Sequence, residues 1–334
     1  MKKILITGSS GFIGGFLIQE ALGLNFEVYA GIRSTSSKRY LQDGRINFLT
    51  LDFSNPQKLQ SQLVEFKKEN GKFDYIVHNA GTTKAKDDQE YYLVNCQYTK
   101  NFVEALQEAG MVPGKFIYIS SLAAYGPGNE TDFEPIRNKH IPHPVTAYGR
   151  SKLESEKYLV SLTNFPFVIL RPTVVYGPRD KNLLMVFKMI NNHFEVFLGS
   201  SEQRLTFVYV KDLARAVYSA IQSKIINQGY FVTDGNNYQI KTFTHLIKRN
   251  LGKRTLSLRL PIPLVKLAAF LMEKIYGFSG EVPAFNREKV NELTALNWTC
   301  ETQPFYRDMK FKAQYDLDKG VAETIDWYKQ EKWL

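Results

Sequence analysis

Short apolar runs alternate with segments of helical periodicity along the first half of the chain. This alternation predicts parallel strands joined by right-handed crossover helices, the pattern of a doubly wound α/β sheet. The predicted strands cover residues 3–6, 27–30, 46–51, 75–78, 115–119 and 167–170. Helices are expected between them, for example at 13–22, 95–109 and 148–162. Ligands of such a sheet bind beyond the carboxyl ends of its strands, so the loops there are the first candidates for chemistry.

The chain changes character near residue 182, where prolines break it into shorter helices. Residues 204–210 and 229–233 resemble a pair of strands within this half. We therefore expect a sheet domain at 1–181 and a smaller α/β lobe at 182–334 that mainly binds the substrate. Some segments of the lobe are expected to return to the sheet. No repeat, low-complexity tract or flexible linker separates the two parts.

Composition narrows the class of protein. With 334 residues, 44% of them hydrophobic, the chain can bury a large core. Its net charge of +10 suits an anionic partner, but the cations are scattered without basic blocks, so no nucleic-acid partner is expected. Cys96 and Cys300 stand far apart with no Cys/His cluster. We expect buried free thiols, without a disulfide or a metal site.

Two features bear on membranes. The N-terminal segment lacks the apolar stretch and cleavage site of a secretion signal, so a cytoplasmic protein is expected. The most apolar helical candidate, residues 264–272, is interrupted by Lys266 and followed by Glu273 and Lys274. It is too short to span a bilayer. We expect an amphipathic lobe helix there, and the pattern leaves open whether it packs in the core or touches a substrate or a membrane.

A glycine-rich segment, Gly8-Ser9-Ser10-Gly11-Phe12-Ile13-Gly14, directly follows the first strand and opens a helix. Glycines at this spacing permit a tight turn, a close approach to a pyrophosphate and close helix packing. A glycine triplet alone is weak evidence and also fits an ordinary turn. The strand–turn–helix context favours dinucleotide binding.

The end of the second strand bears on which dinucleotide binds. An NAD enzyme usually has an acidic residue there, whereas Ile32 occupies this position and Arg33 follows, with Lys38 on the same loop. A guanidinium suits a 2′-phosphate, which favours NADP(H) and leaves NAD(H) possible. Arg33 also fits a solvated surface position. Asp52 could accept from the adenine amino group and Asn79-Ala80-Gly81 could pack beside the pyrophosphate, although both also fit plain turns.

Tyr148 and Lys152 are one turn apart on a predicted helix, so the lysine ammonium can lie near the tyrosine hydroxyl. A nearby cation would lower the pKa of the phenol and let it act as an acid or a base. The same spacing recurs at Tyr306, Tyr315 and Tyr328, but only Tyr148 follows a strand that ends in Ser120-Ser121. Those hydroxyls could hydrogen-bond a developing alkoxide.

Together these segments resemble the extended short-chain dehydrogenase/reductase superfamily, also described as the NAD-dependent epimerase/dehydratase family. The resemblance covers nearly the whole chain and is carried by residues 8–14, 78–81, 120–126, 148–152, 171–178 and 207–212. It implies a Rossmann-type fold, a homodimer, and catalysis by Ser121, Tyr148 and Lys152, with Lys152 also a ribose ligand. The implied cofactor contacts are Gly8, Ser10, Gly11, Phe12, Ile13, Gly14, Arg33, Lys38, Asp52, Phe53, Asn79, Ala80, Gly81, Asn95, Ser120, Tyr148, Lys152, Pro172 and Val175.

The resemblance leaves the reaction open. Dehydratases of the family carry an acidic pair where this chain has Leu122-Ala123, which counts against a sugar dehydratase. Nucleotide-sugar epimerases usually carry an arginine where this chain has Leu205, with Arg204 one place early. The loop at 30–36 and the apolar segment at 261–272 look like those of dihydroflavonol-reductase-like and hydroxysteroid-dehydrogenase-like enzymes. We expect an oxidoreductase acting on an apolar secondary alcohol or ketone. A nucleotide-diphosphate-sugar epimerase and a non-catalytic NAD(P)-sensing protein are the alternatives.

Overall fold

Seven parallel strands form the central sheet of the computed structural model, which describes residues 1–199, 202–277 and 286–334. Their order is β11-β6-β5-β4-β1-β2-β3. The strands are β1 (Lys3–Thr7), β2 (Glu27–Ile32), β3 (Ile46–Thr50), β4 (Tyr75–His78), β5 (Lys115–Ile119), β6 (Phe167–Pro172) and β11 (Gln228–Val232). The predicted α/β class and Rossmann-type parallel sheet are therefore confirmed, and all six expected strands are present.

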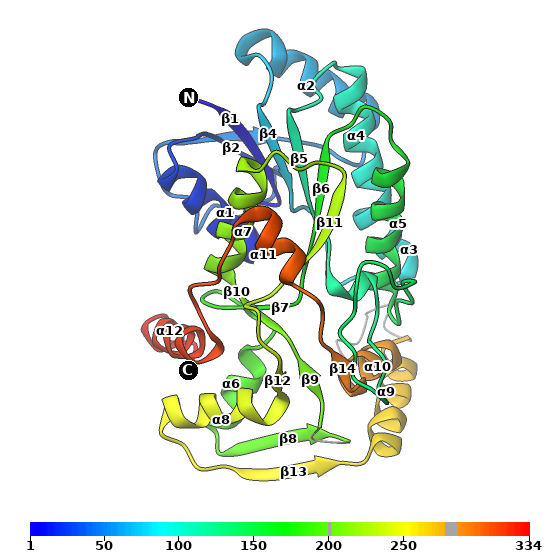
Figure 1. The fold of residues 1–334 in the computed structure, drawn as a ribbon, viewed down its shortest axis with the longest axis vertical. Coiled ribbons are helices and arrows are strands. Elements are labelled where there is room, and N and C mark those ends of the chain that lie inside the picture. The colour runs from blue at the N-terminus through cyan, green and yellow to red at the C-terminus, as the bar shows by residue number, and fades with distance from the viewer. Residues whose placement is uncertain (200–201, 278–285) are drawn as a thin grey trace.

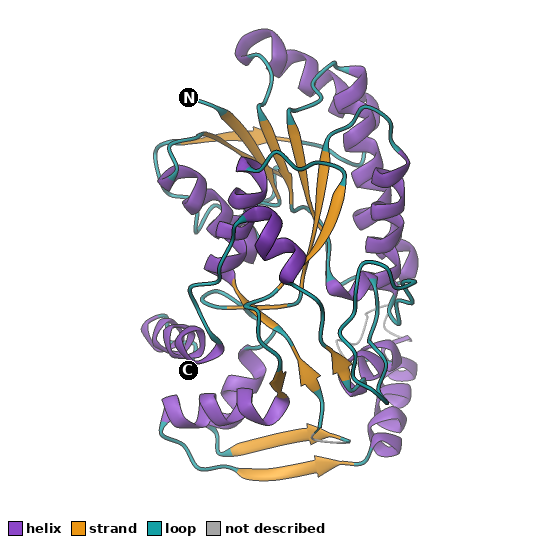
Figure 2. Cartoon of the chain, viewed as in Figure 1, coloured by secondary structure: helices purple, strands orange, loops and turns teal. Residues whose placement is uncertain are grey.

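Helices cover both faces of this sheet, so most of its strand residues are buried (Figure 2). One face packs against α1 (Phe12–Gly23), α7 (Val210–Gln222) and α11 (Gln303–Met309). The other face packs against α2 (Pro56–Asn70), α4 (Tyr98–Glu108) and α5 (Ala147–Ser161). Burial on both sides explains why the strands are nearly continuous apolar runs rather than alternating patterns.

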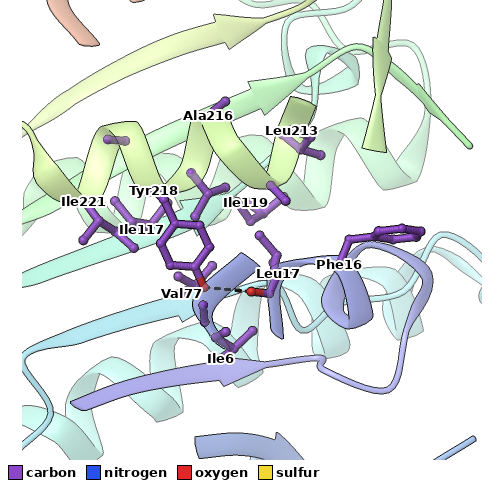
Figure 3. Packing of buried hydrophobic residues seen from close by; sticks show 14 of the residues in the cluster. Ile6, Phe16, Leu17, Val77, Ile117, Ile119, Leu213, Ala216, Tyr218 and Ile221 are labelled. Carbon is purple, nitrogen blue, oxygen red and sulfur yellow. Dashed lines mark hydrogen bonds between the residues drawn. The ribbon is translucent and has the colours of Figure 1, made fainter. Parts of the chain in front are cut away.

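The packing of α1 and α7 on the sheet is seen in Figure 3, where Ile6, Val77 and Ile117 of neighbouring strands meet residues of both helices. Tyr218 of α7 lies between the helices, and its hydroxyl donates a hydrogen bond to the carbonyl of Leu17 at 2.8 Å. The buried phenol thus has a partner, so its burial adds packing without an unsatisfied donor. Helix α7 comes from beyond residue 181 and yet belongs to the core of the sheet domain.

Three small sheets lie below the main sheet in Figure 1. They are the pair β7 (Val174–Tyr176) and β10 (Phe207–Tyr209), the triplet β12 (Tyr238–Gln239), β9 (Arg204–Leu205) and β14 (Asn297–Trp298), and the pair β8 (Phe194–Leu198) and β13 (Leu256–Leu260). The lobe helices are α6 (Leu184–Asn191), α8 (Ile240–Leu251), α9 (Ile262–Gly277), α10 (Arg287–Thr294) and α12 (Leu317–Gln330).

Two expectations about local structure are wrong. Residues 204–210 and 229–233 do not pair with each other: β9 and β10 are separate lobe strands, and β11 pairs in parallel with β6 at the edge of the main sheet. The helix expected at 95–109 begins differently, because α3 (Asp88–Tyr91) leads into a π-helical turn, η1 (Tyr92–Gln97), before α4 starts. The expected helices at 13–22 and 148–162 are present within one residue at each end as α1 and α5.

Candidate active site

The glycine-rich segment forms a tight turn between β1 and α1. Gly8 has a left-handed φ of +66°, and a Cβ placed there would lie 2.7 Å from the carbonyl oxygen of Asn79. A Cβ on Gly14 would lie 2.2 Å from the carbonyl oxygen of Gly8. Gly11 is the N-cap of α1 and Phe12 and Ile13 begin its first turn, which holds no acidic residue. The backbone N–H groups of this turn therefore face a position that suits a pyrophosphate, so the residues fit a dinucleotide.

Polar side chains fix this turn to the end of β4. The hydroxyl of Thr7 accepts hydrogen bonds from the backbone N–H of Asn79 at 3.2 Å and of Ala80 at 3.1 Å. It also pairs with Nδ1 of His78 at 2.9 Å, and Nε2 of His78 pairs with the hydroxyl of Thr99 at 3.1 Å. Burial lowers the pKa of His78 to about 3, so its ring is neutral at physiological pH.

The end of β2 carries the residues expected to distinguish the dinucleotides. Ile32 is buried at the acidic position, and Arg33 beyond it is exposed. The loop is folded locally, because the Ser36 hydroxyl accepts a hydrogen bond from the backbone N–H of Arg33 at 3.0 Å. The ammonium of Lys38 lies 4.0 Å from the centre of the Phe48 ring and so packs toward β3. Arg33 is exposed directly beyond the strand end.

Asp52 and Phe53 follow β3, and their side chains contact neighbouring residues of the protein. The carboxylate of Asp52 accepts from the Ser54 hydroxyl at 2.6 Å and pairs with Lys58 at 3.1 Å, contacts that lower its pKa. The ring of Phe53 packs edge-on against His78, with centroids 5.8 Å apart. Both residues thereby position the strand end, and contact with an adenine stays a prediction.

Helix α5 begins where the catalytic tyrosine is expected. Thr146 is its N-cap and accepts a hydrogen bond from the backbone N–H of Gly149 at 3.1 Å. Glu288 of α10 accepts from the backbone N–H of Ala147 at 2.6 Å and forms an ion pair with Arg150 at 2.6 Å. These contacts place Tyr148 in the first turn of α5 and join that turn to the lobe.

The structure brings Ser121 and Tyr148 together. The Ser121 hydroxyl accepts a hydrogen bond from the backbone N–H of Ala123 at 3.1 Å and lies near enough to the Tyr148 hydroxyl to act on the pKa of that phenol. Burial raises the pKa of Tyr148 to about 12, although the nearby Ser121 hydroxyl acts in the opposite direction. Two neighbouring hydroxyls at the carboxyl end of β5 can share protons with a substrate oxygen.

Lys152 lies one turn further along α5 and is buried. Its ammonium donates a hydrogen bond to the carbonyl oxygen of Ile119 at 2.8 Å and lies 4.8 Å from the centre of the Tyr118 ring. Burial lowers its pKa to about 8. Burial of the phenol is the main cause of the raised pKa of Tyr148, and Lys152 contacts a backbone carbonyl, so a lowering of that pKa by Lys152 stays a prediction.

Asn95 and Gly81 border the lysine. The side chain of Asn95 accepts from the backbone N–H of Thr82 at 2.8 Å and donates to the Ser151 hydroxyl at 2.9 Å. A Cβ placed on Gly81 would lie 2.8 Å from Asn95 Oδ1 and 3.4 Å from Lys152 Nζ. Asn95 belongs to the π-helical turn η1, a feature that is frequent at functional sites. The wide turn directs the amide toward the loop after β4.

The side chain of Ser120 points in another direction than that of Ser121. It is buried and its hydroxyl donates to the carboxylate of Glu156, so this side chain does not face a substrate oxygen as expected. Successive residues of an extended strand point to opposite sides, which explains why Ser121, and not Ser120, lies on the side of Tyr148. Pro172 closes β6 and Val175 lies in β7, and their predicted contact with a nicotinamide ring stays a prediction.

Sequence reasoning missed Arg179, which follows β7 with a φ of +75°. Its guanidinium stacks between two rings, 4.6 Å from the centre of Phe16 and 4.3 Å from that of Tyr40. Its Nη1 would lie 2.9 Å from a Cβ on Gly15 of α1. Nε and Nη1 are buried without a hydrogen-bond partner. A half-buried cation with open donors therefore lies beside the helix that follows the glycine turn.

No cluster of metal-ligating side chains is present among residues 1–199, 202–277 and 286–334. Cys96 and Cys300 are both buried free thiols. In the same part of the chain no helix is long and apolar enough to cross a membrane.

Comparison with known proteins decides the family. Residues 4–231, more than half of the chain, match the model of the NAD dependent epimerase/dehydratase family. The chain belongs to this family. Its members include NAD-dependent epimerases, dehydratases and dehydrogenases, and the chain is accordingly an enzyme of this class.

Three curated relatives show the range of substrates. UDP-glucose 4-epimerase of Vibrio cholerae is 29% identical over 289 residues, covering 82% of this chain and 83% of the relative. Ceramide reductase of Caulobacter vibrioides is 23% identical and covers 99% and 96%. N-acetyl-alpha-D-glucosaminyl-diphospho-ditrans,octacis-undecaprenol 4-epimerase of Escherichia coli O157:H7 is 25% identical and covers 97% and 95%. The relatives thus differ in both reaction and substrate.

Solved structures agree on the fold. The crystal structure of gox2253 superposes with a TM-score of 0.81 at 20% identity, covering all of both chains. UDP-glucose 4-epimerase of Thermus thermophilus in complex with NAD superposes with a TM-score of 0.77 at 19% identity, covering 98% of this chain and 99% of that one. These likenesses show a shared Rossmann-type architecture.

Proposed function

We propose that the protein transfers a hydride between a nicotinamide dinucleotide and a secondary alcohol or ketone, with Tyr148 as the acid/base. The observation that carries this proposal is the proximity of the Ser121 and Tyr148 side chains, which follow β5 and begin α5 at the carboxyl end of the sheet. A bound nicotinamide supplies the hydride or accepts it. Every other part of the reaction is assigned to side chains and backbone groups of this chain.

The three side chains have separate roles. Tyr148 gives its hydroxyl proton to a ketone oxygen, or takes the proton of an alcohol, while Ser121 donates a hydrogen bond to the same oxygen. The ammonium of Lys152 holds a ribose hydroxyl and adds positive charge near the phenolate. In the structure this ammonium already has one fixed partner, Ile119, so it is held in place for further hydrogen bonds.

We assign NADP(H) as the preferred cofactor, with NAD(H) as the alternative. Ile32 offers no carboxylate to the ribose hydroxyls and would not repel a 2′-phosphate, and exposed Arg33 can reach such a phosphate. Assembly as a homodimer also stays a prediction.

The substrate proposed for net reduction is an apolar ketone. Leu205, at the position where nucleotide-sugar epimerases usually carry an arginine, is buried in the core of the lobe. Arg204 is exposed, and its guanidinium stacks 4.2 Å from the centre of the Phe133 ring. Leu205 therefore offers no cation to a sugar diphosphate, and the Arg204 guanidinium packs on Phe133.

A nucleotide-sugar 4-epimerase is the second candidate, because the Vibrio cholerae epimerase is 29% identical to this chain. The two candidates differ in net consumption of the cofactor. Purified protein would be incubated with UDP-glucose or UDP-N-acetylglucosamine without added cofactor, and separately with NADPH and a series of long-chain ketones. Loss of NADPH absorbance with ketones alone supports the reductase. Isomerised sugar without net cofactor consumption supports the epimerase and overturns the reductase.

A further inference from the structure

The two-stranded sheet at the far end of the lobe exposes an apolar face. β8 and β13 run in parallel with Leu256 opposite Phe194, Leu258 opposite Val196 and Leu260 opposite Leu198. Alternation places these six side chains on one face. The exposed fractions are 48% for Phe194, 61% for Leu256 and 41% for both Leu258 and Leu260. The pair forms the lower edge of the molecule in Figure 1.

The opposite face of this pair is already occupied. Glu195 of β8 is buried, accepts from the Ser257 hydroxyl at 2.5 Å and pairs with Lys248 of α8 at 3.0 Å. Phe197, two residues further along the same face, is buried as well. This face therefore fixes the sheet to the lobe, and the leucine-rich face is left toward solvent, where an apolar patch indicates an interaction site.

Helix α9, which follows β13 in the chain, carries further exposed leucines. It starts two residues after β13, and Leu264, Leu267 and Leu271 share one side of it with exposed fractions of 60%, 53% and 49%. Val265 and Ala269, on another side, pack against Val290 of α10 and Leu198 of β8. We use the name outer leucine surface for Phe194, Leu256, Leu258, Leu260, Leu264, Leu267 and Leu271.

The charges around this surface favour an anionic lipid partner over a second copy of the chain. Lys253 and Arg254 precede β13, and Lys266 and Lys274 lie on α9 among its exposed leucines. Arg259 alternates with Leu258 and Leu260 and so lies on the opposite face of β13. The one acidic residue of 253–274 is Glu273. Arg287 of α10 already pairs with Glu273 at 2.7 Å. A second copy docked face to face would bring two cationic rims together, which is unfavourable. An anionic lipid surface attracts the same cations while its acyl boundary accepts the leucines.

We propose that the outer leucine surface docks the protein on an anionic lipid membrane. The leucines enter the acyl boundary and Lys266 and Lys274 of α9 lie at the level of the headgroups. This docking does not depend on the reaction proposed above, since lipid binding is measured without a substrate.

The test is co-sedimentation of the full-length protein with vesicles. Vesicles of phosphatidylcholine alone would be compared with vesicles that also contain phosphatidylglycerol. We expect binding to the phosphatidylglycerol vesicles that weakens as salt is raised. Absence of binding to these vesicles at low salt would overturn the proposal.

Variants locate the contact. The double substitution L264D/L267D should weaken vesicle binding by about tenfold or more, because each leucine loses its burial in lipid. Val160 of α5 is 65% exposed on the sheet domain, so Val160→Asp is a matched control that should bind as the wild type does. Retention of the wild-type circular dichroism shows that each variant is folded.

Equal binding by L264D/L267D and the wild type overturns the proposal. A wild-type dimer in ultracentrifugation that L264D/L267D dissociates, without any lipid binding, assigns the surface to a second copy instead.

Discussion

The guanidinium of Arg171 in β6 and the carboxylate of Glu156 in α5 form a buried ion pair beside Ser120, which follows β5. Arg171 Nη2 lies 2.7 Å from Glu156 Oε2, and the two side chains are 8% and 4% exposed. Glu156 also accepts from Ser120, and Arg171 lies 4.7 Å from the centre of the Tyr125 ring. The pair therefore connects β6 and α5 to the segment that presents Ser121.

Removal of one partner should destabilise the fold. Arg171→Met leaves the Glu156 carboxylate buried without its cation, so we expect the free energy of unfolding to fall by about 3–5 kcal/mol. Urea denaturation measures the change. Lys157→Met removes the exposed pair with Glu154 on the same helix and should cost less than about 1 kcal/mol. Equal losses in the two variants would contradict the assignment.

Loss of the Tyr148 hydroxyl should abolish proton transfer. Tyr148→Phe is expected to lower kcat by roughly 10²–10⁴-fold with little change in cofactor affinity, because the ring and its packing are kept. Steady-state kinetics and cofactor fluorescence titration measure the two quantities. Tyr158→Phe on the same helix removes a hydroxyl that contacts Glu104 at 3.4 Å, away from the site, and should keep full activity. Full turnover by Tyr148→Phe would exclude the proposed acid/base.

A methyl group at Gly14 should block the cofactor. A Cβ there would lie 2.2 Å from the Gly8 carbonyl oxygen, so Gly14→Ala must displace the turn and should weaken dinucleotide binding by more than about tenfold. Titration calorimetry measures the affinity. Gly23, at the other end of α1, has nothing within 4 Å of the place that a Cβ would take, so Gly23→Ala should bind normally and gain up to about 1 kcal/mol of stability.

The 2′-phosphate contact assigned to Arg33 predicts that removal of this side chain weakens the binding of NADPH and not that of NADH. Arg33→Ala should weaken NADPH binding by about tenfold or more, as expected for a charge-assisted hydrogen bond of roughly 1.5–3 kcal/mol, and leave NADH unchanged. Arg39→Ala is the control, because Arg39 lies on the same loop but pairs with Glu331 at 2.9 Å. An equal loss for both dinucleotides would reject the assignment.

The lowered pKa of Lys152 predicts a pH dependence of stability. This lysine titrates at about pH 8 in the folded protein against a reference pKa of 10.5, so the unfolded chain binds more protons between these values. The difference in unfolding free energy between the wild type and Lys152→Met should then shift in favour of the wild type by about 1.4 kcal/mol per pH unit between about pH 8 and pH 10.5. Denaturation of both proteins across this range measures it. A constant difference would show that Lys152 keeps an ordinary pKa.

The central sheet could be predicted from the sequence because its strands are buried on both faces and bounded by turns. β4 and β5 have the predicted bounds, and the glycine turn follows from its position between β1 and α1. The place of β11 could not be predicted in this way. Its apolar run fits either a lobe sheet or the main sheet, and the choice depends on its distant partner β6.

The site was predictable in part for a similar reason. The spacing of Tyr148 and Lys152 within one helix is local, but the partner of each side chain is not. Ile119 as the acceptor for Lys152, and Glu156 as the acceptor for Ser120, depend on how α5 packs on β5. The π-helical turn at Asn95 also lacks a local signal, because its residues, YLVNCQ, suit an ordinary α-helix.

The return of α7 and β11 from the second half of the chain has a consequence for dissection of the protein. A fragment that ends at residue 181 would lack the strand that pairs with β6 and the helix whose Tyr218 reaches Leu17. It would expose an unpaired strand edge and a broad apolar face of the sheet, both of which promote aggregation. The catalytic half cannot be excised or exchanged between relatives as an independent module, and chimeras need junctions beyond residue 232.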